Sequence, residues 1–140
     1  MFHCFGMVLA MTAAMTHGTT MCPITAFSPR KGLHCINQEK ITAFHGVPTM
    51  FIAELNHPDF DSFDLSHLRT GIMAGSPCPP ETMREVMDRM YMKEITICYG
   101  LTETSPVFTQ TSADDDIEHK CETVGRKHPP VDVRVIDPAD

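Results

Sequence analysis

Short apolar runs alternate with helix-like segments along the middle of the chain, and this order constrains the fold more than any other feature. Three of the runs read ITAFHGVP from Ile41, TGIMAG from Thr70 and ITIC from Ile95. The segments between them have the apolar spacing of helices of about ten residues. Strands that alternate with helices of this length form βαβ units, so we expect an α/β fold with a parallel sheet and flanking helices.

Helix boundaries can be placed from the same pattern. Four helices are predicted, over residues 5–15, 32–40, 48–56 and 81–90. Pro48 and Pro80 fit the first turns of the last two, because proline lacks the N–H that a helix start leaves unpaired. Gly18 is predicted to stop the first helix, and Leu33 and Ile36 are expected to face inward from the second. One further short helix is expected from Asp64, within a polar link.

Two other segments have strand-like patterns. TTMCPITAF, residues 19–27, is predicted to be a short buried strand interrupted at Pro23. VDVRVID, residues 131–137, alternates apolar and polar residues, which predicts a half-buried strand in a different, antiparallel sheet.

The first residues form an apolar segment from Phe2 to Met15, and no charged residue precedes Arg30. The segment lacks the positive start and cleavage site of a signal peptide, and at about 14 residues it is too short to span a bilayer. We therefore predict a buried helix and no transmembrane segment. Because the chain begins without a polar lead-in, we expect it to be a piece of a longer protein.

The formal net charge of -7 argues against a nucleic-acid partner, which would call for clusters of lysine and arginine. Much of the acidity is local and comes from five residues: Asp114, Asp115, Asp116, Glu118 and Glu122. We interpret this segment as a solvated loop. A cation site is the alternative, although the glycine-centred spacing of a calcium loop is missing.

Cysteine and histidine spacing gives no sign of a metal site. The six cysteines form no C-x-x-C pair, and several lie in apolar runs. Reduced thiols in an intracellular protein are expected, rather than zinc ligands or a disulfide framework. The eight histidines also lack the spacing of a helical ligand pair with a third ligand nearby.

Two consecutive predicted strands end in unusual loops, AGSPCPP and CYGLTETSP. Ligands of open α/β sheets bind beyond the carboxyl ends of the strands. Tyr99 offers a flat face for a base, Thr102 a hydroxyl for a phosphate, and Glu103 a hard oxygen ligand for magnesium. Gly75 and Gly100 would let the backbone approach a ligand. These features suit an adenine nucleotide with its metal; the alternative is a glycine turn with a Thr/Glu pair that caps a helix.

The segment YGLTETSP resembles the Tyr-Gly-x-Thr-Glu motif of the AMP-forming adenylating superfamily, which includes acyl-CoA synthetases, luciferases and the adenylation domains of peptide synthetases. Four other segments resemble the family in the same order: FHCFGM, GVPTMF, AGSPCPPE and ETVGRKHPPVDVRVID. The resemblance covers essentially the whole chain. Residues 46–81 are most similar to mitochondrial medium-chain acyl-CoA synthetases.

The resemblance implies a fatty-acid–CoA ligase that uses ATP, Mg²⁺ and CoA. The carboxylate of a fatty acid attacks the α-phosphate of ATP to form an acyl-adenylate, and the CoA thiol then displaces AMP. Thr102 and Glu103 would be the catalytic residues, with Glu103 as the magnesium ligand and His3 gating the acyl side. Residues at the two strand ends would bind the nucleotide: Gly75, Ser76, Pro77, Tyr99 and Gly100.

The resemblance also implies what surrounds this chain. The family's phosphate loop would precede His3, and its ribose-binding aspartate and C-terminal lid would follow Asp140. We therefore expect a partial N-terminal domain, with residues 1–112 in the α/β sheet and 121–140 at the start of a small β subdomain. The segment VGRKHPP departs from the family where a Pro-Leu or similar pair usually follows Arg126, which leaves the conformation of that turn open.

Two other functions are alternatives to a fatty-acid–CoA ligase. A non-catalytic nucleotide-binding remnant, or a regulatory paralogue, would keep the same motifs without the phosphate chemistry. A Rossmann-type oxidoreductase is disfavoured because no G-x-G-x-x-G follows a strand. If the subfamily resemblance holds, the complete protein would be mitochondrial.

Overall fold

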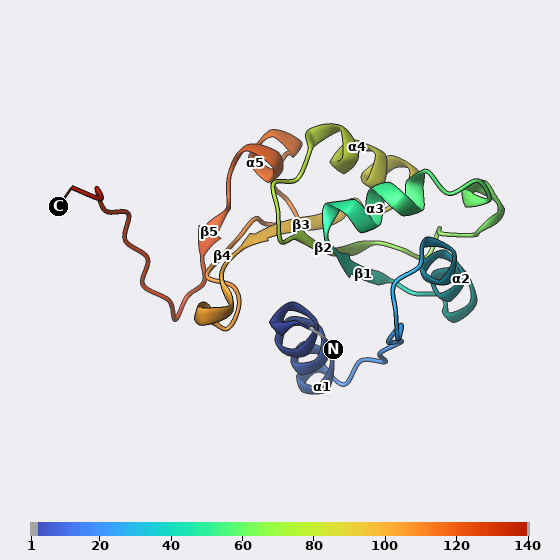
Figure 1. The fold of residues 1–140 in the computed structure, drawn as a ribbon, viewed down its shortest axis with the longest axis horizontal. Coiled ribbons are helices and arrows are strands. Elements are labelled where there is room, and N and C mark those ends of the chain that lie inside the picture. Colours follow the sequence, from blue (N-terminus) through green and yellow to red (C-terminus); the bar gives the residue numbers. More distant parts are fainter. Residues whose placement is uncertain (1–2, 140) are drawn as a thin grey trace.

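Five strands form one sheet, in the order β1-β2-β3-β4-β5, in the computed structural model, which describes residues 3–139 (Figure 1). The strands are β1 (Ala43–Gly46), β2 (Thr70–Ala74), β3 (Glu94–Tyr99), β4 (Thr109–Gln110) and β5 (Arg126–Lys127). The first three pair in parallel, which confirms the predicted parallel sheet. The last two pair antiparallel and extend it. They were missed because two residues are too few to show an alternating pattern.

Three of the helices begin with proline in the first turn, as the sequence predicted for two of them. The helices are η1 (Phe5–Thr12), α1 (Ala13–His17), α2 (Pro29–Glu39), α3 (Pro48–Leu55), η2 (Phe60–Ser62), α4 (Pro80–Arg89), η3 (Thr102–Thr104) and α5 (Ile117–Glu122). In Figure 1, α3, α4 and α5 lie above the sheet and the N-terminal helix lies below it. No helix between residues 3 and 139 combines the length and apolar content needed to cross a membrane.

The core lies between the sheet and helices α2, α3 and α4. Leu33 and Ile36 of α2 are buried, as predicted, and Phe51 of α3 packs edge-on against Phe44 of β1. Four methionines are fully buried in the same cluster: Met73, Met83, Met90 and Met92. Their unbranched thioether side chains fill irregular gaps between helices and sheet.

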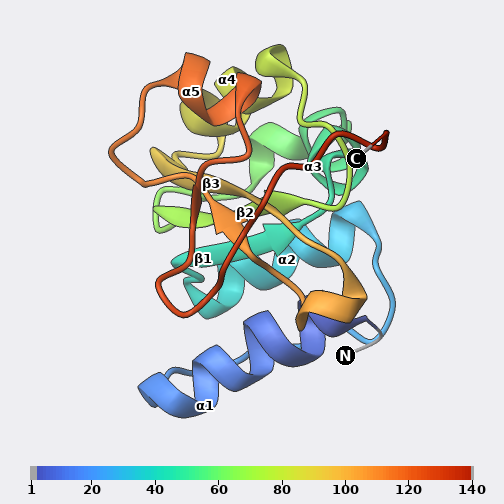
Figure 2. The same cartoon turned by 90° about the vertical axis from the view of Figure 1, so that its left-hand side faces the viewer.

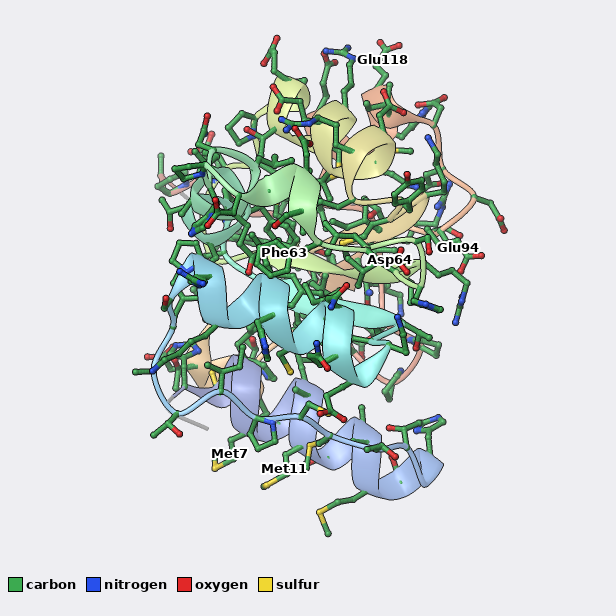
Figure 3. All side chains as sticks on the ribbon, turned by 90° about the vertical axis from the view of Figure 1, so that its right-hand side faces the viewer. Met7, Met11, Phe63, Asp64, Glu94 and Glu118 are labelled. Carbon is green, nitrogen blue, oxygen red and sulfur yellow. The ribbon has the colours of Figure 1, made fainter. Side chains whose placement is uncertain are left out.

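The N-terminal helix is present but is not buried, which corrects the prediction. Phe5–Thr12 is a π-helix that continues as α1, and Ala14 is its only buried residue. Met7 and Met11 point away from the sheet (Figure 3), and Met15 is 72% exposed. Apolar composition predicted burial, but the helix lies apart from the core. Phe2, where the predicted segment begins, is outside the described residues.

Three local predictions were wrong. Residues 19–27 form no strand, because within the described part of the chain no strand lies beside them to accept their backbone hydrogen bonds. The same holds for residues 131–137, where Val135 and Ile136 are exposed. The short helix of the polar link is η2, which ends before Asp64; Asp64 instead accepts a hydrogen bond from Ser66.

The acidic segment is more ordered than a solvated loop. Asp116 caps α5 by accepting a hydrogen bond from the backbone N–H of His119 at 2.8 Å. Asp115 accepts from the backbone N–H of Ser112 and from Arg126. These hydrogen bonds lower the pKa of both carboxyls, which favours their charged forms. Asp116 thereby stabilises the start of α5, and Asp115 stabilises the position of Arg126 in β5.

Candidate functional site

The parallel register brings the ends of β2 and β3 together. Ala74 pairs with Cys98, so Gly75 and Tyr99 follow as neighbours at one edge of the sheet. The end of β1 joins them, because Val47 Cγ1 would lie 3.1 Å from a Cβ on Gly75. We call this the strand-end site: it comprises Val47, Gly75 and Tyr99 with the loops that follow Gly75 and Tyr99. It therefore contains residues from the ends of three strands. The sequence analysis did not name Val47 as a site residue, although Val47 lies in the strand-like run ITAFHGVP and in the segment GVPTMF.

The loop after β2 takes its shape from glycine and from a buried thiol. Gly75 has φ of +92°, a conformation that side chains disfavour, and Ser76 and Pro77 are exposed beyond it. Cys78 is buried, and its Sγ donates to the carbonyls of Met73 and Ser76 at 3.5 and 3.6 Å. Burial raises the pKa of Cys78 to about 12. The thiol therefore stays protonated at neutral pH and shapes the loop rather than acting as a nucleophile.

Tyr99 presents an aromatic ring at the end of β3, and the side chain is 47% exposed. Its ring packs edge-to-face with Phe108, with centroids 5.0 Å apart and planes at 73°. Such a pair occupies at most one face of the tyrosine, and about half of the side chain is accessible to solvent. An open aromatic face at a strand end can stack on a purine base.

The turn after Tyr99 depends on its own backbone contacts. A Cβ on Gly100 would lie 1.9 Å from the carbonyl oxygen of Pro106, so the turn itself requires glycine here. Thr104 Oγ1 accepts from the N–H of Leu101 at 3.0 Å and donates to its carbonyl at 2.8 Å.

Thr104 therefore closes η3, and Thr102 and Glu103 remain exposed on it. This argues against the alternative in which Thr102 and Glu103 serve as a helix cap. Sequence reasoning missed Thr104, because a threonine one position beyond the motif carries no signal of its own.

The N-terminal helix reaches this turn from the far end of the sequence. Thr102 Oγ1 lies 3.5 Å from His3 Nε2, and Cys4 Sγ donates to the same oxygen at 3.6 Å. Figure 2 shows the start of the helix beside the turn that carries η3. The structure thus joins His3 to Thr102, two predicted site residues separated by 99 positions.

The residues present fit a magnesium ion that is shared with phosphates. Between residues 3 and 139, no three His, Cys, Asp or Glu side chains gather into a metal site. Glu103 offers a single exposed carboxylate on η3, next in sequence to the exposed Thr102. Magnesium is commonly held by one or two carboxylates together with substrate phosphates and water.

All six cysteines are free, so none of them forms a disulfide bond.

Comparison with known proteins identifies the class. The family model described as "AMP-binding enzyme" matches residues 1–140. The chain therefore belongs to the family of AMP-binding enzymes.

Within that family, the chain is similar to acyl-CoA ligases. It is 56% identical over 137 residues to the putative acyl-CoA synthetase YngI of Bacillus subtilis, covering 98% of this chain and 25% of that protein. It is 46% identical to the acyl-CoA ligase sidI of Aspergillus fumigatus, with 98% and 23% covered. The mitochondrial medium-chain acyl-CoA ligase ACSF2 of Danio rerio is 45% identical, with 99% and 23% covered.

Solved structures agree on the fold. A benzoate CoA ligase from Burkholderia xenovorans superposes with a TM-score of 0.87 at 22% identity, covering 99% of this chain and 28% of that one. The N-terminal domain of FACL13 from Mycobacterium tuberculosis gives 0.79 at 24% identity, with 91% and 31% covered. The chain thus has the fold of part of these proteins, and in FACL13 the matching part lies in the N-terminal domain. The chain spans about a quarter of the length of the relatives it matches.

Proposed function

We propose that this chain is the base-binding and metal-binding part of an acyl-CoA synthetase that activates a medium-chain fatty acid with ATP. One observation carries the proposal: Tyr99 and the Thr102–Glu103 pair lie at one strand end, and His3 contacts Thr102. A base site, a phosphate-binding hydroxyl, a carboxylate and an acyl-side histidine are thereby adjacent.

Each group has a distinct task in adenylate formation. The open face of Tyr99, with the loop of Gly75, Ser76 and Pro77, would hold adenine. Thr102 would donate a hydrogen bond to a phosphate oxygen, and Glu103 would hold Mg²⁺. Bound magnesium supplies positive charge that stabilises the departing pyrophosphate. His3, beside Thr102, would place the fatty-acid carboxylate close to the α-phosphate, because orientation of the two reactants is a large part of such catalysis.

Acyl-chain length, domain boundaries and compartment belong to the same proposal. Relatives named mitochondrial medium-chain acyl-CoA ligases, at 38–45% identity, support a medium-chain acid and a mitochondrial location for a complete protein of that type. The name of the bacterial relative, a putative acyl-CoA synthetase, indicates no compartment. We assign residues 1–112 to the α/β part and residues 121–140 to the start of a small β subdomain.

A chimera tests the proposal. When this chain replaces the matching 137-residue segment of YngI, we expect acid-dependent ATP–pyrophosphate exchange and acyl-CoA formation with medium-chain acids. The 140 residues alone should form neither product, because they carry no phosphate loop and no lid lysine to position charge around the reacting phosphate. A folded chimera without exchange, beside an active unmodified YngI, would favour the non-catalytic remnant. Acyl-CoA made by the isolated chain would contradict the assignment as a partial site.

Tyr99→Ala in the chimera should raise the KM for ATP while leaving kcat and the KM for the acid nearly unchanged. A stacked base is held about equally in the ground state and the transition state, so its loss weakens binding rather than chemistry. Stacking of roughly 1–3 kcal/mol implies an increase in the KM for ATP of about fivefold to 150-fold. Tyr91→Ala is the matched control, since Tyr91 is exposed before the opposite end of β3. A change confined to the KM for the acid would instead indicate that Tyr99 lies in the acyl pocket.

A further inference from the structure

Phe108 is a residue that no motif singled out, and it is the aromatic partner of Tyr99. We propose that Phe108 is a positioning residue for ATP: it fixes the orientation of the Tyr99 ring so that the open face is ready for adenine. This inference rests on the proposed function and adds a residue to the strand-end site.

Backbone hydrogen bonds hold Phe108 in place from two sides. Its N–H donates to the carbonyl of Tyr99 at 3.2 Å, and its carbonyl accepts from the N–H of His128 at 2.9 Å. Thr109, the next residue, pairs with Tyr99 in the β3–β4 ladder. The backbone of Phe108 is thereby tied to that of Tyr99 and to the segment after β5, so its ring has a defined position against the tyrosine.

The ring of Tyr99 needs such a partner because it projects from the end of the sheet. The side chain is about half exposed, and Phe108 is its one aromatic partner among the described residues. An exposed tyrosine without a packed neighbour would sample several rotamers, and stacking would then require ordering the ring. The edge-to-face contact orders the ring in advance and leaves a face free, which is how supporting residues preorganise a binding group.

The experiment is a double-mutant cycle in the chimera. Phe108→Ala should raise the KM for ATP by about threefold to tenfold, the range that an edge-to-face aromatic pair supports, with kcat and the KM for the acid unchanged. Phe108→Tyr, which keeps the ring, should restore the KM of the unmutated chimera. In a Tyr99→Ala background, Phe108→Ala should have no further effect, because its contribution passes through the tyrosine.

The matched control is Phe63→Ala, which removes an edge-to-face pair with His57 in the polar link before β2. It should leave the KM for ATP unchanged. Phe108→Leu guards against misfolding, since it keeps apolar bulk and should still raise the KM. Additive effects of the Tyr99 and Phe108 substitutions, or an equal loss in kcat, would overturn the inference while the proposed function stands. A folded chimera that neither binds ATP nor exchanges pyrophosphate would overturn both.

Discussion

Glu103→Gln should slow formation of the acyl-adenylate by about 100-fold or more, which is the scale for removing one electrostatic group that stabilises developing charge. The substitution keeps the shape of the side chain and removes its charge. If Glu103 holds Mg²⁺ as proposed, the substitution would weaken that ligand as negative charge grows on pyrophosphate. Because Glu103 is exposed on η3, where Thr104 closes the turn, we expect no loss of folding.

The measurement is ATP–pyrophosphate exchange in the chimera, with the rate followed as a function of magnesium concentration. The fall should appear chiefly in kcat and should be partly reversed at high magnesium, because the remaining ligands still bind the ion. Glu118→Gln is the matched control, an exposed carboxylate on α5 at the outer surface (Figure 3). Exchange at the unmutated rate in the Glu103→Gln variant would show that Glu103 takes no part in the reaction.

The second large effect concerns Glu54, a carboxyl that is completely buried on α3. Neither carboxyl oxygen has a hydrogen-bond partner among residues 3–139, and Oε1 lies against Gly32 of α2, where a Cβ would be only 2.1 Å away. Desolvation raises the pKa of Glu54 from 4.5 to about 8. The folded protein therefore holds this carboxyl protonated at neutral pH.

This burial makes stability fall as pH rises. The unfolded chain releases the proton near pH 4.5, whereas the folded chain keeps it until about pH 8. Between these values the folded state binds more protons, so the free energy of unfolding decreases with pH and levels off above pH 8. At about 1.4 kcal/mol per pKa unit, the total decrease is of the order of 5 kcal/mol.

Urea unfolding of the chimera at several pH values tests this expectation. Glu54→Met should remove the decrease and should be the more stable protein above pH 8, with a smaller advantage at about pH 4, where the carboxyl is protonated but still unpaired. Glu54→Gln separates charge from polarity: it should remove the pH dependence but keep an unpaired amide in the core. A parent protein whose pH profile matches that of Glu54→Gln would show that the carboxyl is not desolvated.

Much of the site was predictable because it depends on the order of residues along the chain. Apolar runs and helix-starting prolines predicted β1, β2, β3 and the helices between them. Parallel strands end at the same edge, so the loops at Gly75 and Tyr99 were expected to meet there. The resemblance indicated the family, and the family match confirmed it.

The sequence by itself therefore determined the βαβ order, the strand ends that meet and the family, since these depend on local spacing and on motifs. Only the tertiary structure decided which side chains share a contact. It placed His3 beside Thr102, Phe108 against Tyr99 and Glu54 against Gly32 of α2. It also left residues 131–137 without a partner strand among the described residues. Burial and pairing are properties of the neighbours that surround a residue in space, and a pattern along the chain does not specify those neighbours.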